Sequence, residues 1–482
     1  MENSLLILLL LFAYFGLLLF ISKLIGKKGG NDAFFSGNKK SPWYLVSIGM
    51  IGASISGVSF VSVPGMVREN GFLYMQTVVG FFFGYLIIAK ILLPLYYKLE
   101  SPSIYTYLQK RYGQRAYKTG AWFFLISKSV GAAARVYIVA IILQTLILKN
   151  MSIPFPATVA ILVLMIWLYT FQGGIKTIVR TDVIQTILIF VTLILIILEF
   201  GNAMGKDVHG IWETVSTSQW FKLTEFSDWH SKQHFVKQFF SGIFIALVMT
   251  GLDQGMIQKN ISINRLDEAQ KNMYLYGFAF IPLNFLFLTL GALMLTFSSE
   301  NGIVLPSSSD EILPMLATQG YLNTFVLVLF TIGIVSAAFS SAGSAMTALT
   351  TSFCVDIAEE SDSVRFRKYV HFGIALLFIA IILIFRYSNN KTLIDTIYVV
   401  ASYTYGPLLG LYSFGLFTKR KSADRFIPYI AILSPVFCFI LQSVSQRWLN
   451  YSFGYELLML NGLLTFTGLW LTSTKQENYG NK

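Results

Sequence analysis

Residues 333–347 read GIVSAAFSSAGSAMT, an apolar stretch in which small residues are interleaved with hydroxyls. In a bilayer, small residues let helices approach closely, and hydroxyls bond the backbone or a neighbouring helix. A dense cluster of uncharged oxygens also suits a hard, weakly held cation, because such oxygens can replace its hydration shell. The stretch therefore predicts a buried membrane helix that contacts a cation such as sodium.

The rest of the chain is also apolar. Of its 482 residues, 55% are hydrophobic and 12% are charged, about half the charged fraction of a soluble protein. Many apolar runs approach the roughly 20 residues that cross a hydrocarbon core of ~30 Å. They predict an all-α polytopic membrane protein, a single domain over residues 1–482, with about 13 spans at 4–25, 43–67, 72–97, 119–148, 154–171, 179–200, 238–257, 273–297, 320–355, 369–386, 393–417, 427–446 and 454–473.

Basic residues predict the orientation. Alternate loops, beginning with 22–42, hold most of the 36 Lys and Arg residues, and the side richer in these residues is cytoplasmic. The N-terminus is thus expected outside and the C-terminus inside a cell membrane, either the inner or the plasma membrane. The net charge of +12 then reflects topology, and no nucleic-acid partner is expected. Because Glu2 precedes the first run, we interpret that run as a retained helix and not a signal peptide.

Two spans contain residues that break helices. The second includes residues 51–60, IGASISGVSF, followed by Pro64, and the seventh ends in residues 249–259, MTGLDQGMIQK. Gly, Ser and Pro are poor helix formers and are tolerated at membrane depth where freed carbonyls line a cavity. Interrupted spans at corresponding places in two halves indicate a transporter site. The second span could equally be a kinked, tightly packed helix. In the seventh we favour Asp253 as a helix cap or an ion-pair partner of Lys259.

Two charged residues lie inside apolar runs, where a charge is costly and requires a partner or water. Asp182 could pair with Arg180 or Lys176 as a structural anchor, or it could coordinate a cation. Arg135 follows the small residues 131–134, GAAA, which would let it point into a bundle. A guanidinium suits bidentate binding of a solute carboxylate, and an internal acid or backbone carbonyls are the alternative partners.

Motifs for enzymes and ATP-driven pumps are missing from the sequence. There is no Walker lysine loop and no His-rich metal spacing, and no nucleophile–base arrangement stands out. The two cysteines, Cys354 and Cys438, lie in or at the end of apolar runs and indicate neither a disulfide framework nor a metal site. Neither an enzyme nor a catalytic cofactor is therefore expected.

Four blocks of residues together resemble the sodium:solute symporter family. They are residues 54–57 (SISG) with Pro64-Gly65, Gly173-Gly174 with residues 181–185 (TDVIQ), Asp253-Gln254 with Gln258, and Ser340-Ser341 leading to Asp356. Their order and spacing match that family across nearly the whole chain. The resemblance implies a LeuT-type core of two inverted five-helix repeats, at about 43–200 and 238–417, with one extra helix before it and two after.

The resemblance also implies a sodium site between the first and the eighth core helices. Its ligands would be the main-chain carbonyls of Gly52, Ile55 and Ala337 and the hydroxyls of Ser340 and Ser341. Sodium would be the coupling ion.

Some members of the family hold a second sodium ion. Asp182, Ser341 and Ser344 match that pattern, whereas Gly343 stands where those members tend to have another hydroxyl. The solute is expected near the two interruptions, with candidate contacts at Ser56, Ser59, Tyr74, Gln76, Arg135, Met249 and Thr250.

We therefore predict a sodium-coupled symporter that imports a small organic solute by alternating access, with one monomer as the transport unit in the lipid bilayer. The resembling sialic acid carriers have an arginine about one turn from Arg135, and positions used by sugar carriers hold Ser54, Val78 and Phe81 here. A carboxylate-bearing solute, such as a sialic acid, an amino acid or a monocarboxylate, is favoured over a sugar or a vitamin. A channel would need a filter that the sequence lacks, and a transport-inactive nutrient sensor is the other alternative.

Overall fold

The computed structural model describes residues 2–26, 30–148, 152–387, 393–448, 451 and 453–474. These residues form helices and one short antiparallel strand pair, which confirms the predicted all-α fold. The elements in chain order are α1 (Glu2–Gly26), α2 (Asn31–Ser36), η1 (Gly37–Lys39), α3 (Trp43–Ser54), α4 (Gly57–Gly65), α5 (Val67–Asn70), α6 (Tyr74–Ile87), η2 (Ile88–Leu92), α7 (Leu93–Leu99), α8 (Thr106–Arg111), α9 (Gln114–Leu143), η3 (Gln144–Leu148), α10 (Phe155–Thr170), α11 (Ile175–Ala203), α12 (Val208–Ser216), α13 (Phe235–Ala246), η5 (Leu247–Gly251), α14 (Gln254–Ile261), α15 (Leu266–Glu300), η6 (Ser309–Glu311), α16 (Ile312–Thr318), α17 (Thr324–Ser352), η7 (Phe353–Ile357), α18 (Val364–Tyr387), α19 (Leu393–Phe417), β1 (Lys421–Ser422), η8 (Asp424–Phe426), α20 (Ile427–Trp448), α21 (Glu456–Thr472) and β2 (Ser473–Thr474).

Each of the predicted spans coincides with one helix or with two or three consecutive helical elements. Within the described residues, eight helices are long and apolar enough to cross a membrane, or ten if each bent pair forms one span. Helices α10 and α21 are shorter apolar helices, and α19 covers the remaining predicted range. The polytopic fold is thus confirmed, whereas the number of thirteen crossings stays a prediction.

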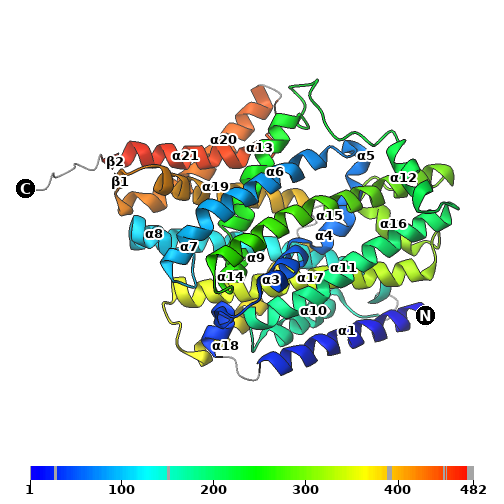
Figure 1. Cartoon of the computed structure of the whole chain (residues 1–482), viewed down its shortest axis with the longest axis horizontal. Coiled ribbons are helices and arrows are strands. Elements are labelled where there is room, and N and C mark those ends of the chain that lie inside the picture. The colour runs from blue at the N-terminus through cyan, green and yellow to red at the C-terminus, as the bar shows by residue number, and fades with distance from the viewer. Residues whose placement is uncertain are drawn as a thin grey trace, which may run out of the picture.

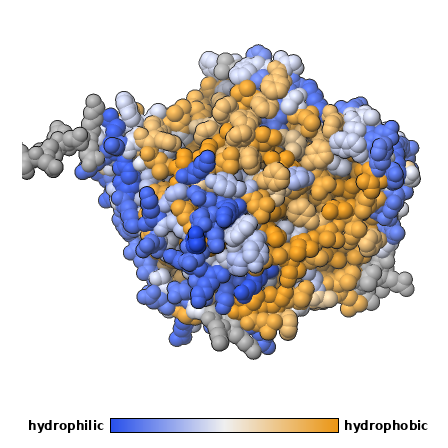
Figure 2. Space-filling view, in the orientation of Figure 1, coloured by the Kyte–Doolittle hydropathy of each residue, from blue (hydrophilic) through white to orange (hydrophobic). Residues whose placement is uncertain are grey.

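The helix that contains residues 333–347, α17, lies in the interior of the bundle. In its most apolar window 78% of the residues are buried, against 22% in α1 and in α20. Figure 1 shows α3, α4 and α17 in the middle of the molecule, with α1 along one side and α20 and α21 along the other. Figure 2 shows hydrophobic side chains across the middle of this face and hydrophilic ones gathered at its left and right ends. Such an apolar belt between polar ends is expected of a protein that spans a bilayer.

Both predicted interruptions are breaks in the helices. The pair formed by α3 and α4–α5 is bent by 63°, and the pair formed by α13–η5 and α14 is bent by 65°. At the first break Ile55 is extended (φ −78°, ψ 127°), and Ser56 starts α4 through a capping box with Ser59. At the second break the Asp253 carboxylate caps α14 by accepting the Met256 amide at 3.1 Å. Each break lies in the first span of one expected repeat, and the boundaries of those repeats stay a prediction.

Candidate functional site

The break between α3 and α4 lies beside the middle of α17. After the break, a Cβ on Gly57 would lie 3.0 Å from the side chain of Ile334 on α17. Before the break, a Cβ on Gly49 would lie 3.0 Å from Cβ of Asp182 on α11. The Asp182 carboxylate in turn accepts a hydrogen bond from Ser340 of α17 at 2.8 Å. The break is therefore level with the turn of α17 between Ile334 and Ser340.

The break frees main-chain oxygens at this level. In a continuous helix the Ser56 amide would bond the Gly52 carbonyl, but it donates to Ser59 Oγ at 3.1 Å. Because Ile55 is extended, its carbonyl also leaves the helical hydrogen-bond ladder. Ala337, the third predicted carbonyl ligand, is fully buried in the facing turn of α17.

The two predicted hydroxyl ligands are buried and keep their lone pairs. Ser340 donates its proton to Asp182 Oδ1 at 2.8 Å, and Ser341 donates to the Ala338 carbonyl at 3.2 Å. A hydroxyl has one proton and two acceptor lone pairs. Both oxygens can therefore still accept, which is the property that a bound cation requires.

Asp182 is paired, and its partner is neither Arg180 nor Lys176. Lys259 Nζ, on α14, lies 2.6 Å from Asp182 Oδ2, and the two side chains are 1% and 0% exposed. The expected pairing of Lys259 with Asp253 is therefore wrong. Ser344 also donates to Asp182 Oδ2, at 3.4 Å. The carboxylate expected to bind a second sodium ion is thus paired with an ammonium group of the chain and also accepts a hydrogen bond from Ser344.

Gly343, at a position where some family members have a hydroxyl, packs closely against a tyrosine. A Cβ at Gly343 would collide with the hydroxyl of Tyr169 on α10. That hydroxyl donates to the Phe339 carbonyl of α17 at 2.6 Å. Tyr169 therefore fills the space in which a side chain at position 343 would lie.

A cavity of about 260 Å³ adjoins the break. Six of the seven predicted solute contacts line it, namely Ser56, Ser59, Tyr74, Arg135, Met249 and Thr250. Sequence reasoning missed other lining side chains, because hydroxyls and aromatic rings occur in many spans and their pattern does not show which of them meet. These further lining residues include Ser62, Thr77, Tyr85, Ser127, Tyr276, Phe280 and Asn284.

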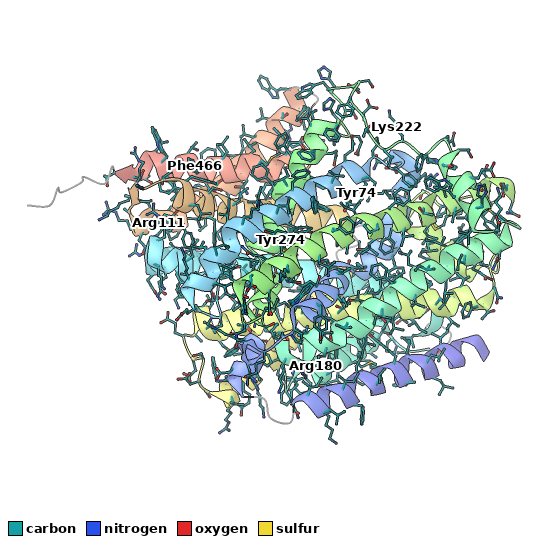
Figure 3. The ribbon with its side chains drawn as sticks, in the orientation of Figure 1. Tyr74, Arg111, Arg180, Lys222, Tyr274 and Phe466 are labelled. Atoms are coloured by element: carbon teal, nitrogen blue, oxygen red, sulfur yellow. The ribbon has the colours of Figure 1, made fainter. Side chains whose placement is uncertain are left out.

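Gln76, the seventh predicted contact, does not line this cavity. Its amide donates to the Gln233 carbonyl at 2.9 Å, and its Oε1 accepts the Glu225 amide at 2.9 Å. Both partners belong to the loop 201–237. In this loop, hydrogen bonds from Lys222 and Ser227 lower the pKa of the Glu225 carboxyl to about 2. Gln76 therefore anchors the loop to α6, and Figure 3 shows the loop, at Lys222, near the end of α6 that carries Tyr74.

Three charged residues line the cavity, and two of them pair with each other. Lys128 Nζ lies 2.8 Å from Asp253 Oδ2, and the Tyr405 hydroxyl donates to the same oxygen at 2.9 Å. Asp253 is thus the cap and ion-pair partner that we favoured, although its partner is Lys128. Arg135 lies two turns along α9 from Lys128 and is half-buried. Among the described residues, no hydrogen-bond or ion-pair partner of its guanidinium is found.

Residues 34–424 match the model of the sodium:solute symporter family. The chain belongs to this family. The sodium/sialic acid symporter NanT of Aliivibrio fischeri is 24% identical over 436 residues, 86% of this chain and 83% of NanT. The sodium/sialic acid symporter SiaT of Proteus mirabilis is 22% identical over 447 residues, 88% of this chain and 86% of SiaT. A solved outward-open, substrate-bound Na⁺-coupled sialic acid symporter has a TM-score of 0.82 at 18% identity, covering 98% of this chain and 99% of that one.

The symporter is therefore a sodium-coupled membrane transporter of small solutes with a LeuT-like fold, and it is not an enzyme.

Besides Asp253, two tyrosine hydroxyls form hydrogen bonds to the backbone at the second break. Tyr96 donates to the Gly251 carbonyl at 2.7 Å, and Tyr105 donates to the Leu252 carbonyl at 3.1 Å. Gln254 donates to the Pro102 carbonyl at 2.6 Å and accepts from the Ile104 amide at 3.0 Å. These bonds tie the second break to the segment between α7 and α8.

Proposed function

We propose that this symporter imports a small solute that bears a carboxylate and several hydroxyls. The observation that carries the proposal is Arg135, a cavity-lining guanidinium without a described partner. A half-buried cation is costly without a counter-charge, and a carboxylate can bind a guanidinium through two parallel hydrogen bonds. The serines at the first break would bind solute hydroxyls. NanT and SiaT are both sialic acid symporters, which supports the same chemical class here.

Sodium would bind at the first break. Its ligands would be the carbonyls of Gly52, Ile55 and Ala337 and the hydroxyls of Ser340 and Ser341, in agreement with the freed carbonyls and available lone pairs at this level. An ion shifts a conformational equilibrium only by its differential affinity for the two states. A site shared between the broken helix and α17 provides that difference, because its two halves separate when the helices move apart.

Uptake into proteoliposomes would test the proposal. Solutes of five classes, a sialic acid, a monocarboxylate, an amino acid, a sugar and a vitamin, would first be screened by thermal shift in sodium and in potassium. The hit would then be used for uptake with and without an inward sodium gradient. We expect accumulation above equilibrium only with the gradient. A channel would stop at equilibrium, and a sensor would show no uptake.

The Ser341→Ala variant is expected to raise the sodium concentration for half-maximal uptake roughly tenfold, which corresponds to about 1.4 kcal/mol. The reason is the loss of one of five oxygens, since interactions of a neutral group with a charge contribute roughly 1.5–3 kcal/mol. Sodium dependence of uptake measures the effect. Ser336→Ala removes a buried hydroxyl from the same helix and is the matched control. An unchanged sodium dependence of Ser341→Ala would contradict the assignment.

We also propose a cell membrane location with the N-terminus outside, the C-terminus inside and a monomer as the transport unit. The orientation is supported by the alternation of basic loops along the chain. Under this orientation the loop 201–237 is external, and the end of the molecule that carries Arg111, at the left in Figure 3, is cytoplasmic. Labelling of single cysteines placed in loop 201–237 by an impermeant reagent on intact cells would check it.

A further inference from the structure

We propose that the Lys259 ammonium stands permanently in the place of a second co-transported cation, so that the symporter carries one sodium ion per cycle. This inference goes beyond the proposed function and uses from it only the sodium site at the first break. It concerns a different carboxylate, that of Asp182, which the proposed site does not use as a ligand.

The surroundings of Asp182 are those of a cation site. Its two carboxylate oxygens meet three groups on two other helices: Lys259 at 2.6 Å, Ser340 at 2.8 Å and Ser344 at 3.4 Å. One more hydroxyl, that of Thr347, follows on the same face of α17, is buried and lacks a hydrogen-bond partner among the described residues. A carboxylate with hydroxyls around it is a ligand set for a hard cation, and here one cation is already covalently attached.

Because both side chains are buried, the Lys259 ammonium stays beside the Asp182 carboxylate. Lys259 is 1% exposed and Asp182 is 0% exposed, so neither charge has access to water in this state. A charged side chain within the membrane is costly unless it is paired, so each of these two charges stabilises the other. A mobile cation that entered beside Lys259 would meet a carboxylate whose charge is already balanced, and like charges at this distance repel.

A tethered cation has a direct consequence for coupling. It cannot leave toward the cytoplasm, so it adds nothing to the driving force, whereas each mobile sodium ion adds its own gradient. One sodium ion carried with a solute of single negative charge also moves no net charge. Transport of such a solute would then be insensitive to the membrane potential.

Equilibrium binding of radioactive sodium to the purified full-length symporter tests the inference without any solute. We expect wild type to saturate at one ion per chain with a Hill coefficient of one. In Lys259→Met the freed Asp182 and its hydroxyls should bind a second ion. In Asp182→Asn/Lys259→Met, which has no charge at this position, the number should return to one.

Two controls make the result specific. Lys128→Met breaks a second lysine–aspartate pair, but Asp253 is contacted by a backbone amide and Tyr405 and by no hydroxyl of α17, so this variant should keep one site. Ser341→Ala in wild type should weaken the single site. If it does not, the proposed sodium site fails, while the count in Lys259→Met still tests the present inference.

The inference is overturned by two sodium ions per wild-type chain. It is equally overturned by one ion per chain in a Lys259→Met variant that shows a cooperative thermal transition in sodium. If that variant is unfolded in sodium-free buffer, its melting temperature is measured at increasing sodium concentrations instead. This temperature should rise with sodium more steeply than that of wild type, and an equal rise would contradict the inference.

Discussion

Asp182→Asn is expected to lower the free energy of unfolding by about 3–5 kcal/mol, because removal of one partner leaves a buried charge uncompensated. Lys259 is 1% exposed, and Ser340 and Ser344 can supply hydroxyl oxygens but no negative charge. The melting temperature of the purified protein should fall by roughly 3–5 °C, because the entropy of unfolding is about 2.1 cal/mol/K per residue and the chain is long. Thermal unfolding followed by intrinsic fluorescence, in the same detergent as for wild type, measures the change.

The chain offers a matched control for this substitution. Asp267 pairs with Arg265 at 2.9 Å, but these side chains are 49% and 68% exposed, and exposed pairs contribute about 0–1 kcal/mol. Asp267→Asn should therefore leave the melting temperature nearly unchanged. The double variant Asp182→Asn/Lys259→Met should recover most of the loss, since it removes both charges. Equal effects of Asp182→Asn and Asp267→Asn would show that the Asp182–Lys259 pair does not stabilise the fold.

Arg135→Met is expected to weaken binding of a carboxylate solute by about 3 kcal/mol, roughly 100-fold, because it removes a charge-assisted partner. Arg135→Lys should weaken it roughly tenfold, since an ammonium retains the charge but lacks the planar fork that binds both carboxylate oxygens. Binding of N-acetylneuraminic acid and of its methyl ester, compared by thermal shift in sodium, measures the effect. The uncharged ester should bind wild type and both variants nearly equally.

Arg68→Lys is the control for this prediction. Arg68 is exposed, donates to the Pro306 carbonyl at 2.6 Å and does not line the cavity, so its substitution should leave binding of the acid unchanged. If Arg135→Met lowered the affinity for acid and ester equally, the arginine would act on the shape of the cavity and would not bind a carboxylate.

Features of this symporter that depend on neighbouring residues in the chain could be read from the sequence. The length of an apolar run predicts a helix because every backbone polar group must be satisfied within lipid. The residues 51–60 predicted a break because Gly and Ser favour non-helical backbone. Asp253, in a polar cluster flanked by glycines, is predicted to cap a helix or form an ion pair, and the structure shows its bond to the Met256 amide. These features need only local chemistry.

Partners across the bundle could not be read in this way. Asp182 had basic residues nearby in sequence, yet it pairs with Lys259, 77 residues away. Gln76 and Tyr74 are both predicted solute contacts on one helix, but a helix turns about 100° per residue, so residues two apart lie on nearly opposite sides. Gln76 bonds the loop 201–237 instead.

The composition and order of residues thus specified an all-helical membrane protein with two broken spans, because hydrophobicity and helix propensity act over a few turns of chain. The tertiary arrangement of α9, α11 and α14 pairs Lys259 with Asp182 and Lys128 with Asp253, and it leaves the guanidinium of Arg135 without a partner among the described residues. That outcome depends on distances between side chains from different helices, and a linear pattern of residues does not contain those distances.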